Sequence, residues 1–193
     1  LQALPGVEAV GFVSAGLPLE RGGNNGVQIA GAAEPRWLSV DYREVTPGFL
    51  RTLGVPLREG RAFSETDDGR AAPVAHVNEA FVRTYLPDRP ALGTRLLLGE
   101  QPVEIVGVIG DLKSRVDEPA EPAVFIPAAQ ADHAISMLFE NWFARHLLVR
   151  TQGDPQALSR AIAGILADAD PGVAVGRIRP MDEVFARAVS LPR

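Results

Sequence analysis

The side chains that could perform acid–base or metal chemistry are few and lie far apart in the sequence. The three histidines, His76, His133 and His146, each stand alone, and none has the i, i+4 partner that a helical zinc site requires. His76 falls inside an expected strand, which favours a buried core residue over a metal ligand. The chain has no cysteine, which excludes disulfide bonds, thiolate metal sites and cysteine nucleophiles.

Two glycine-containing motifs resemble catalytic or nucleotide-binding sequences only in part. Ser14 lies within residues 11–16, but this stretch misses the nucleophile-elbow pattern by one position, and no helix is expected after it. Gly107 and Gly110 lack the spacing of a dinucleotide-binding fingerprint, and no helix clearly follows them. Neither motif predicts catalysis.

The acidic run at residues 65–68 could suggest a calcium-binding site. It lacks the alternating ligands of a twelve-residue calcium loop. Ser64, followed three residues later by Asp67, instead favours the start of a helix. We therefore expect no catalytic residue, no cofactor and no bound metal in this chain.

Composition narrows the function classes further. The chain has 193 residues, of which 46% are hydrophobic and 22% are charged, as in an ordinary globular protein. The formal net charge of −5 disfavours a nucleic-acid partner, because binding to phosphates needs a basic face. No stretch approaches the run of about 18 apolar residues that a membrane-spanning helix needs.

The first part of the chain predicts two strands and a short helix. Residues 7–13 form an apolar, β-branched run, and the Gly- and Asn-rich residues 22–26 indicate a turn. Residues 37–45 alternate in the manner of a strand with one half-buried face. Thr46 is expected to cap a helix that ends at Gly54.

The middle and the end of the chain predict further strands and helices. We expect an edge strand between prolines at residues 123–126. The other expected elements are a strand at 73–77, a helix capped by Asn78 that ends at Pro87, and a hairpin of residues 95–98 and 102–111 with the loop 99–101. A β-α-β unit follows, with a strand at 146–151, a helix that begins at Asp154 and Pro155, and a strand at 173–179.

A Pro-Gly-Val motif before a strand occurs twice, at residues 5–13 and 171–178. An internal repeat and chance are both compatible with it, because Pro-Gly before a strand is common. Residues 1–4 and 184–189 have the pattern of helices, and we expect both to continue beyond an excised domain. If the two copies are related, the strand at 7–13 should lie with those at 146–151 and 173–179.

Taken in order, these segments resemble the extracytoplasmic core domain of MacB/FtsX-type ABC transporter permeases, especially the MacB-like permeases of acidobacteria. The resemblance covers nearly the whole chain, and it depends on the order and spacing of several motifs because no single motif is decisive. The matching segments are residues 46–63, 73–81, 92–95, 106–111, 148–155 and 170–183.

The resemblance implies an α+β fold in which a porter-like βαβ subdomain is interrupted by a smaller mixed α/β subdomain. The expected division is 1–56 and 141–193 for the porter-like subdomain, with 57–140 as the insertion. In this family the domain lies on the periplasmic side of the inner membrane, between the first and second transmembrane helices. Both ends of the chain are therefore expected on the membrane side.

The resemblance also implies a function without catalysis. The domain would couple ATP-driven motion in the cytoplasm to efflux or to a periplasmic partner. The implied partners are the flanking transmembrane helices, a membrane-fusion or other periplasmic protein, and a second permease in a dimer. The alternative is a small-molecule-binding or hydrolase domain, which would require a pocket that gathers Ser14, His76 or His133 with carboxylates.

One apolar segment has no assigned role. Residues 131–143 include Met137, Leu138, Phe139, Trp142 and Phe143 in a poorly patterned stretch. They either form an exposed patch that contacts a partner or enter the core at the start of the following strand.

Overall fold

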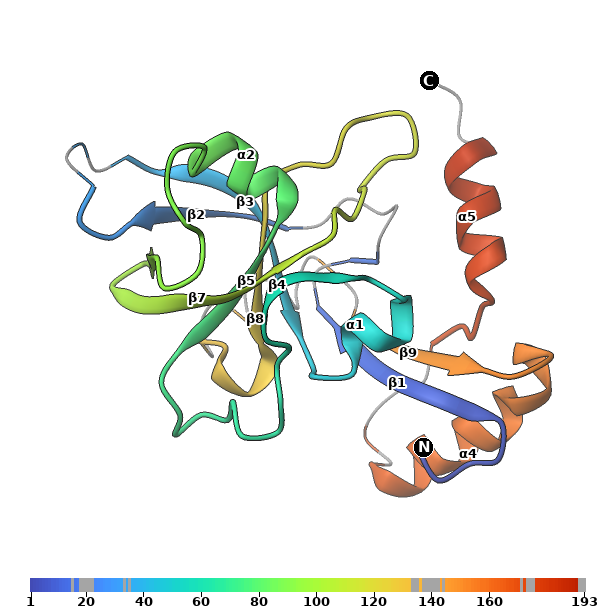
Figure 1. Cartoon of the computed structure of the whole chain (residues 1–193). Helices are drawn as coiled ribbons and strands as arrows, with labels where there is room; N and C mark the ends of the chain where they lie inside the picture. The colour runs from blue at the N-terminus through green and yellow to red at the C-terminus, as the bar shows by residue number, and fades with distance from the viewer. Residues whose placement is uncertain are drawn as a thin grey trace.

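The strands of this chain join into one hydrogen-bonded sheet, seen in the computed structural model of Figure 1. The structure describes residues 1–14, 16–17, 23–32, 34, 36–132, 136, 143, 145–170, 172 and 176–190. The strands in these residues are β1 (Val7–Val13), β2 (Gly23–Ile29), β3 (Leu38–Val45), β4 (Leu57–Gly60), β5 (Val74–Asn78), β6 (Arg95–Leu98), β7 (Gln101–Ile109), β8 (Ala123–Pro127) and β9 (His146–Thr151).

Six of these strands close into a ring. The order along the sheet is β2-β6-β7-β5-β8-β3-β1-β9, and β2 also pairs with β3, so that β2, β6, β7, β5, β8 and β3 form a small barrel. Closure leaves these six strands with hydrogen-bonded neighbours on both sides, which removes most exposed edges. β4 pairs with β7 beside the ring, where β6 has ended.

Apolar side chains fill the barrel. Val27, Leu38, Leu96 and Ile105 point inward from four different strands and belong to one buried cluster. Helix α2 (Glu79–Tyr85) adds Phe81 to the same cluster. The apolar residues alternate along the strands, and this alternation places one face of every barrel strand in the core.

The helices begin and end where local chemistry satisfies their free backbone groups. The Asn78 side chain accepts a hydrogen bond from the Phe81 N–H and caps α2, as predicted. Asp154 caps the 3-10 turn η2 (Pro155–Leu158) that leads into α4 (Ser159–Ala169). Gly54, in the left-handed conformation with φ 71°, ends α1 (Phe49–Leu53) as predicted. The remaining helices are α5 (Met181–Ser190) and the 3-10 turn η1 (Ala128–Gln130).

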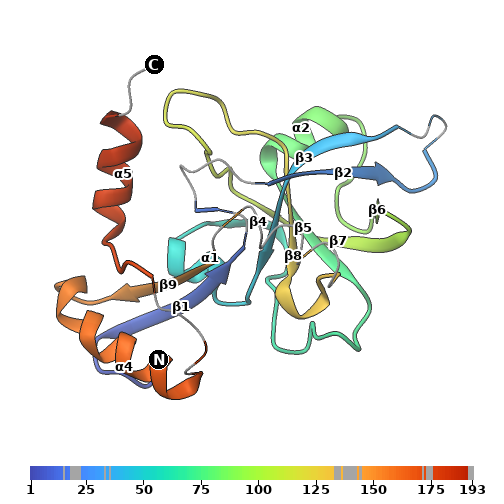
Figure 2. The ribbon, with the colours of Figure 1, turned by 180° about the vertical axis from the view of Figure 1, so that it is seen from behind.

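The two ends of the chain meet outside the barrel. β1 pairs antiparallel with β9 from Val7↔Thr151 to Val13↔His146, which confirms that residues 7–13 lie with 146–151. α1 packs on this pair, and Val13, Phe49 and Leu148 share a second buried cluster. Figures 1 and 2 show α4 and α5 at the same end of the molecule as β1 and β9.

Two predicted elements were wrong because tertiary pairing overrode local composition. The expected turn at residues 22–26 is largely strand β2, which is held between β3 and β6. The expected edge strand at 123–126 is β8, which lies between β3 and β5 and is buried along its length. Its flanking prolines stand at the ends of the ladder, where a missing N–H costs little.

Three finer predictions also need correction. Strand β3 is buried on both faces, since all of its residues except Ser39 are buried. Thr46 does not cap α1; its hydroxyl oxygen accepts a hydrogen bond from the Phe12 N–H instead. The turn between β6 and β7 contains two residues and not three, because Leu98 pairs with Gln101.

The predicted strand at residues 173–179 is not formed where the structure can test it. Residues 173–175 lie outside the described part of the chain, and residues 176–179 have no strand conformation. Residues 1–4 form turns and not a helix, whereas the expected helix at 184–189 is present within α5. Leu1 and α5 lie at the β1–β9 end, but α5 extends away from Leu1 (Figure 1).

The division into 1–56, 57–140 and 141–193 stays a prediction. The barrel takes β2 and β3 from before residue 57 and its other four strands from after it. Among the helices that the structure describes, none combines the length and hydropathy needed to cross a bilayer.

Candidate functional site

Buried polar groups stabilise the place where β1 joins the barrel strand β3. β1 and β3 share one register pair, Val13↔Val45. Side chains complete the contact on either side of it: the Thr46 hydroxyl accepts from the Phe12 N–H at 2.9 Å, and the Ser14 hydroxyl accepts from the Glu44 N–H at 3.0 Å. We call the set of Ser14, Gly16, Asp41, Arg43, Glu44 and Thr46 the joint.

Arg43 is the centre of the joint. Its side chain is only 2% exposed, and its Nε and Nη2 donate to Asp41 Oδ2 at 3.1 and 2.8 Å. Its Nη1 donates to the carbonyl oxygen of Gly16, in the segment that follows β1. One guanidinium thus connects β3 of the barrel to the chain that leaves the β1–β9 pair.

Asp41 extends the joint to the loop between β7 and β8. Its Oδ2 is 3.4 Å from the Ser114 hydroxyl, and its backbone N–H donates to the Pro122 carbonyl at 2.9 Å. Its Oδ1 is buried and has no hydrogen-bond partner among the residues that the structure describes. A buried carboxylate oxygen in this position is a place for an ordered water, which commonly satisfies such groups.

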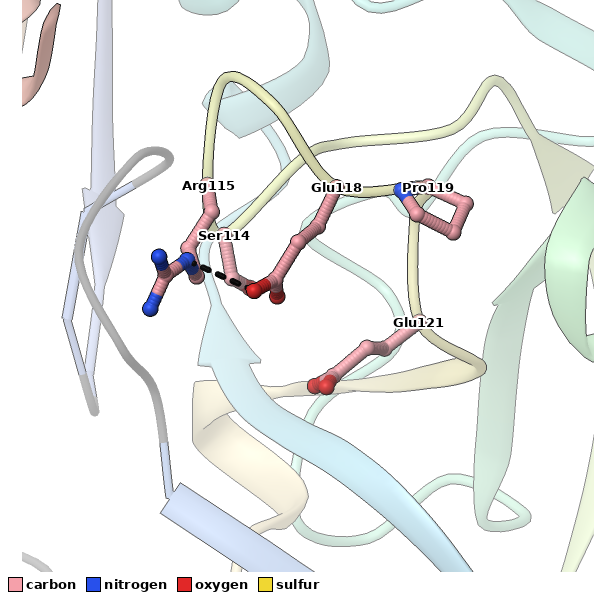
Figure 3. A pocket seen from close by; sticks show the side chains of 5 residues that line it. All are labelled: Ser114, Arg115, Glu118, Pro119 and Glu121. Carbon is pink, nitrogen blue, oxygen red and sulfur yellow. Dashed lines mark ion pairs between the residues drawn. The ribbon is translucent and has the colours of Figure 1, made fainter. Parts of the chain in front are cut away.

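A small pocket opens in this loop (Figure 3). It has a volume of about 120 Å³ and is lined by Ser114, Arg115, Glu118, Pro119 and Glu121. Arg115 Nε and Glu118 Oε1 form an ion pair at 2.9 Å across it, drawn as a dashed line in Figure 3. The pocket is smaller than the roughly 300 Å³ at which ligand sites usually begin. Its lining offers no nucleophile with an adjacent base.

The opposite face of β3 also carries buried polar side chains. Glu44 accepts a hydrogen bond from the Ser136 hydroxyl at 2.7 Å. Burial, followed by the negative charges of Glu44 and Asp132, raises the pKa of the Tyr42 phenol. Tyr42 is therefore a neutral core residue and not a base.

His76 is a core residue, as predicted. It is 1% exposed, and its ring stacks on Phe63 with the ring centres 3.6 Å apart. Its Nε2 lies 2.9 Å from the carbonyl oxygen of Arg61. The pKa of His76 is lowered to about 4, mainly by burial, and the hydrogen bond to the Arg61 carbonyl opposes part of this shift. The imidazole is therefore neutral at pH 7.

Residues 64–67, where a helix start was predicted, form a turn that Arg61 closes. Arg61 Nη2 and Nη1 donate to Asp67 Oδ1 and Oδ2 at 2.7 and 2.8 Å, and the Ser64 N–H also donates to Asp67 at 2.8 Å. The hydrogen bonds from Arg61 lower the pKa of the Asp67 carboxyl to about 2. Asp67 therefore serves as an anchor for this turn.

The histidines and Ser14 are not brought together as a catalytic group in the part of the chain that the structure describes. The Ser14 hydroxyl is used in the joint, and His76 lies against Phe63. His146 lies on β9, and His133 is outside the described residues, as are Met137, Leu138, Phe139 and Trp142 of the apolar segment. Within the described ranges, no three His, Asp or Glu side chains are placed to hold a metal ion.

Sequence reasoning missed the joint because it read β3 as half-exposed. Asp41 and Arg43 occupy alternate positions of a strand, and charged residues there usually face water. The available signal was that Asp41, Arg43 and Glu44 are three charges within four residues of an otherwise apolar strand. Only the tertiary structure shows that both faces are covered: Val40 and Tyr42 lie in the barrel core, and the chain at Gly16 and the loop at Ser114 lie on the face of Asp41 and Arg43.

Comparisons with known proteins agree with this architecture. Residues 1–178 match the family described as the MacB-like periplasmic core domain. The whole chain superimposes on 80% of the periplasmic region of MacB from Actinobacillus actinomycetemcomitans, with a TM-score of 0.68 and 12% identity. No match is found among curated proteins.

Two further solved structures have the same fold. The extracellular domain of the noncanonic ABC-type transporter YknZ from Gram-positive bacteria aligns over 87% of this chain and 79% of its own, with a TM-score of 0.54 and 16% identity. A permease domain from Porphyromonas gingivalis aligns over 96% of this chain and 70% of its own, with a TM-score of 0.57 and 21% identity. At these identities, the likeness concerns the fold alone.

Proposed function

Because the chain belongs to the family of MacB-like periplasmic core domains, and is thus a periplasmic part of an ABC-type transporter permease, we propose that it is a non-catalytic coupling module. It passes motion from the flanking membrane helices to efflux or to a periplasmic partner. ATP is used elsewhere in the transporter, and this domain contributes rigid-body movement.

The observation that supports this proposal is the joint. Strands from the two ends of the chain form the β1–β9 pair, so a displacement of either end moves both strands together. The pair is continuous with the barrel through Val13↔Val45 and through Arg43, whose buried guanidinium contacts Gly16 and Asp41. A buried charge pair adds little stability over apolar residues of similar volume, so we assign the Arg43–Asp41 pair a role in fixing the geometry of the joint.

α1 supports the same transmission path. Gly48 and Gly11 let the start of α1 lie directly on β1, since a Cβ on Gly48 would overlap the Val10 carbonyl oxygen. Arg150 on β9 donates from Nε to the Thr52 carbonyl of α1 at 2.9 Å. The β1–β9 pair and α1 therefore form one packed unit, and Phe49 of α1 connects it to Phe125 of the barrel.

The partners follow from the same proposal. We expect the membrane helices of the same permease to attach at the β1–β9 end, a second permease subunit to complete the transporter, and a membrane-fusion or other periplasmic protein to receive the motion. The hydrolase or small-molecule alternative gains no support from Ser14, which is engaged in the joint, or from the pocket at Ser114.

Hydrogen exchange in the complete permease tests the proposal. We would compare the nucleotide-free protein with the vanadate-trapped protein in lipid nanodiscs, and follow peptides that cover residues 7–17 and 38–46. Trapping should change amide exchange in both peptides, because the β1–β9 pair and the joint carry the motion. The coupling role is refuted if exchange in the whole domain is the same in the two states.

A pair of variants links that response to the joint. Arg43→Met together with Asp41→Leu removes the buried ion pair without leaving an unpaired charge. It should keep ATP hydrolysis and lose the nucleotide-dependent exchange in the barrel. Arg83→Met, which breaks the exposed Arg83–Asp111 pair, is the matched control and should behave like the natural protein.

A further inference from the structure

The outer face of the barrel carries an exposed tryptophan that is seated on a glycine. Trp37 precedes β3 and is 63% exposed, the largest exposed fraction among the large apolar residues of the described chain. A Cβ built on Gly26 would lie 2.8 Å from Trp37 Cε3 and 3.5 Å from Cζ3. Part of the indole therefore lies against the bare backbone of β2, and most of the ring is open to solvent.

The side chains around this indole are uncharged hydrogen-bonding groups. Val27 and Leu38 form a register pair that points into the core, so the alternate residues of both strands face outward. These are Asn24, Gly26 and Gln28 on β2, with Ser39 opposite Gly26 on β3. We call Asn24, Gly26, Gln28, Trp37 and Ser39 the Trp37 platform.

The polar groups of the platform are available to a ligand. No hydrogen bond from the described residues engages the side chains of Asn24, Gln28 or Ser39. The amides each offer one acceptor and two donors, and the hydroxyl offers both functions. β2 and β3 pair with each other from Gly23↔Tyr42 to Val27↔Leu38, so these groups project from a paired ladder and not from a loop.

The strands next to the platform carry charges of both signs. Arg95 on β6 and Glu104 on β7 are a register pair on the same outer face, and opposite charges in such a pair offset each other. Arg36, which directly precedes Trp37, adds one exposed positive charge. The surface therefore suits an uncharged ligand that has a flat apolar face and many hydroxyl groups.

We propose that the Trp37 platform binds a neutral oligosaccharide. The C–H face of a pyranose ring would stack on the exposed indole, because aromatic faces carry partial negative charge and C–H groups partial positive charge. Asn24, Gln28 and Ser39 would bond the ring hydroxyls. This site lies on the barrel, away from the β1–β9 end (Figure 1), and it is independent of the coupling function.

Titration with defined sugars tests the site. The chain, ¹⁵N-labelled and carrying Trp142→Phe so that Trp37 gives the one indole signal, would be titrated with chitotetraose, cellotetraose and maltotetraose. We expect at least one of them to shift the Trp37 indole N–H and the Gly26 amide in a saturable manner. Trp37→Ala should weaken binding by about tenfold or more.

Two further variants distinguish binding at the Trp37 platform from nonspecific binding to exposed aromatic side chains. Gly26→Ala keeps the tryptophan but pushes its ring off the strand, and it should also weaken binding. Phe185→Ala removes an aromatic ring that is 53% exposed on α5 and should leave binding unchanged. The proposal is overturned if none of the three sugars shifts the Trp37 signal, or if Trp37→Ala binds as tightly as the parent chain.

Discussion

Acidification should destabilise this domain through His76. The ring is buried against Phe63, and its pKa is lowered from 6.5 to about 4 mainly by burial. In the unfolded chain the same imidazole takes up a proton near its ordinary pKa of about 6.5. Between these two values the unfolded state binds more protons than the folded state, so acid favours unfolding.

The size of the effect follows from the two pKa values. The contribution of His76 to the free energy of unfolding is fully present above the unfolded pKa of about 6.5 and decreases as the pH falls toward the folded pKa. The interval from 6.5 to about 4 corresponds to about 3 kcal/mol of stability at most. This is a large share of the roughly 5–15 kcal/mol that stabilises an ordinary domain.

Urea unfolding followed by far-UV circular dichroism at pH 7, 6, 5 and 4 measures this loss. The reference is His76→Phe, which keeps an aromatic ring on Phe63 and cannot titrate. It loses the hydrogen bond to the Arg61 carbonyl, a constant offset of about 1 kcal/mol. Relative to His76→Phe, the natural protein should lose about 3 kcal/mol of unfolding free energy from pH 7 to pH 4, so it should be the more stable of the two at pH 7 and the less stable at pH 4.

Asp67 provides a check on the interpretation. Its folded pKa of about 2 lies below its ordinary value, so its stabilising contribution is present above about pH 4 and is lost only below that. It therefore titrates beneath the window of His76. If the difference between the natural protein and His76→Phe is the same at every pH from 7 to 4, the reasoning about the buried imidazole is wrong.

Three further predictions concern the joint, α1 and α4. Arg43→Met alone should lower the unfolding free energy by about 3–5 kcal/mol, because it leaves Asp41 charged and buried, whereas adding Asp41→Leu should restore most of the loss in the same urea assay. Gly48→Ala should lower the melting temperature, since its methyl group would collide with the Val10 carbonyl and lift α1 from β1. Gly164→Ala in α4 meets no atom within 4 Å and should raise stability by up to about 1 kcal/mol; a gain at Gly48 or a loss at Gly164 would contradict this packing.

The elements that local chemistry controls were predictable from the sequence. Asn78 caps α2 and Gly54 ends α1, because a capping side chain and a left-handed glycine act within a few residues of their own position. The strands at 7–13 and 146–151 were also predicted, together with their proximity. The position of His76 inside an expected strand predicted that it is a core residue.

The pairing of strands depended on the tertiary structure. Residues 22–26 have the composition of a turn, yet residues 23–26 pair with β3 and form the first part of β2, which goes on to pair with β6 at Val27–Ile29. Closure of the ring places β8 between β5 and β3, with a hydrogen-bonded neighbour on each side, despite its flanking prolines. The face of β3 that carries Asp41 and Arg43 is buried by the chain at Gly16 and the loop at Ser114. Whether a charged residue faces water or a partner depends on what the rest of the chain places beside it.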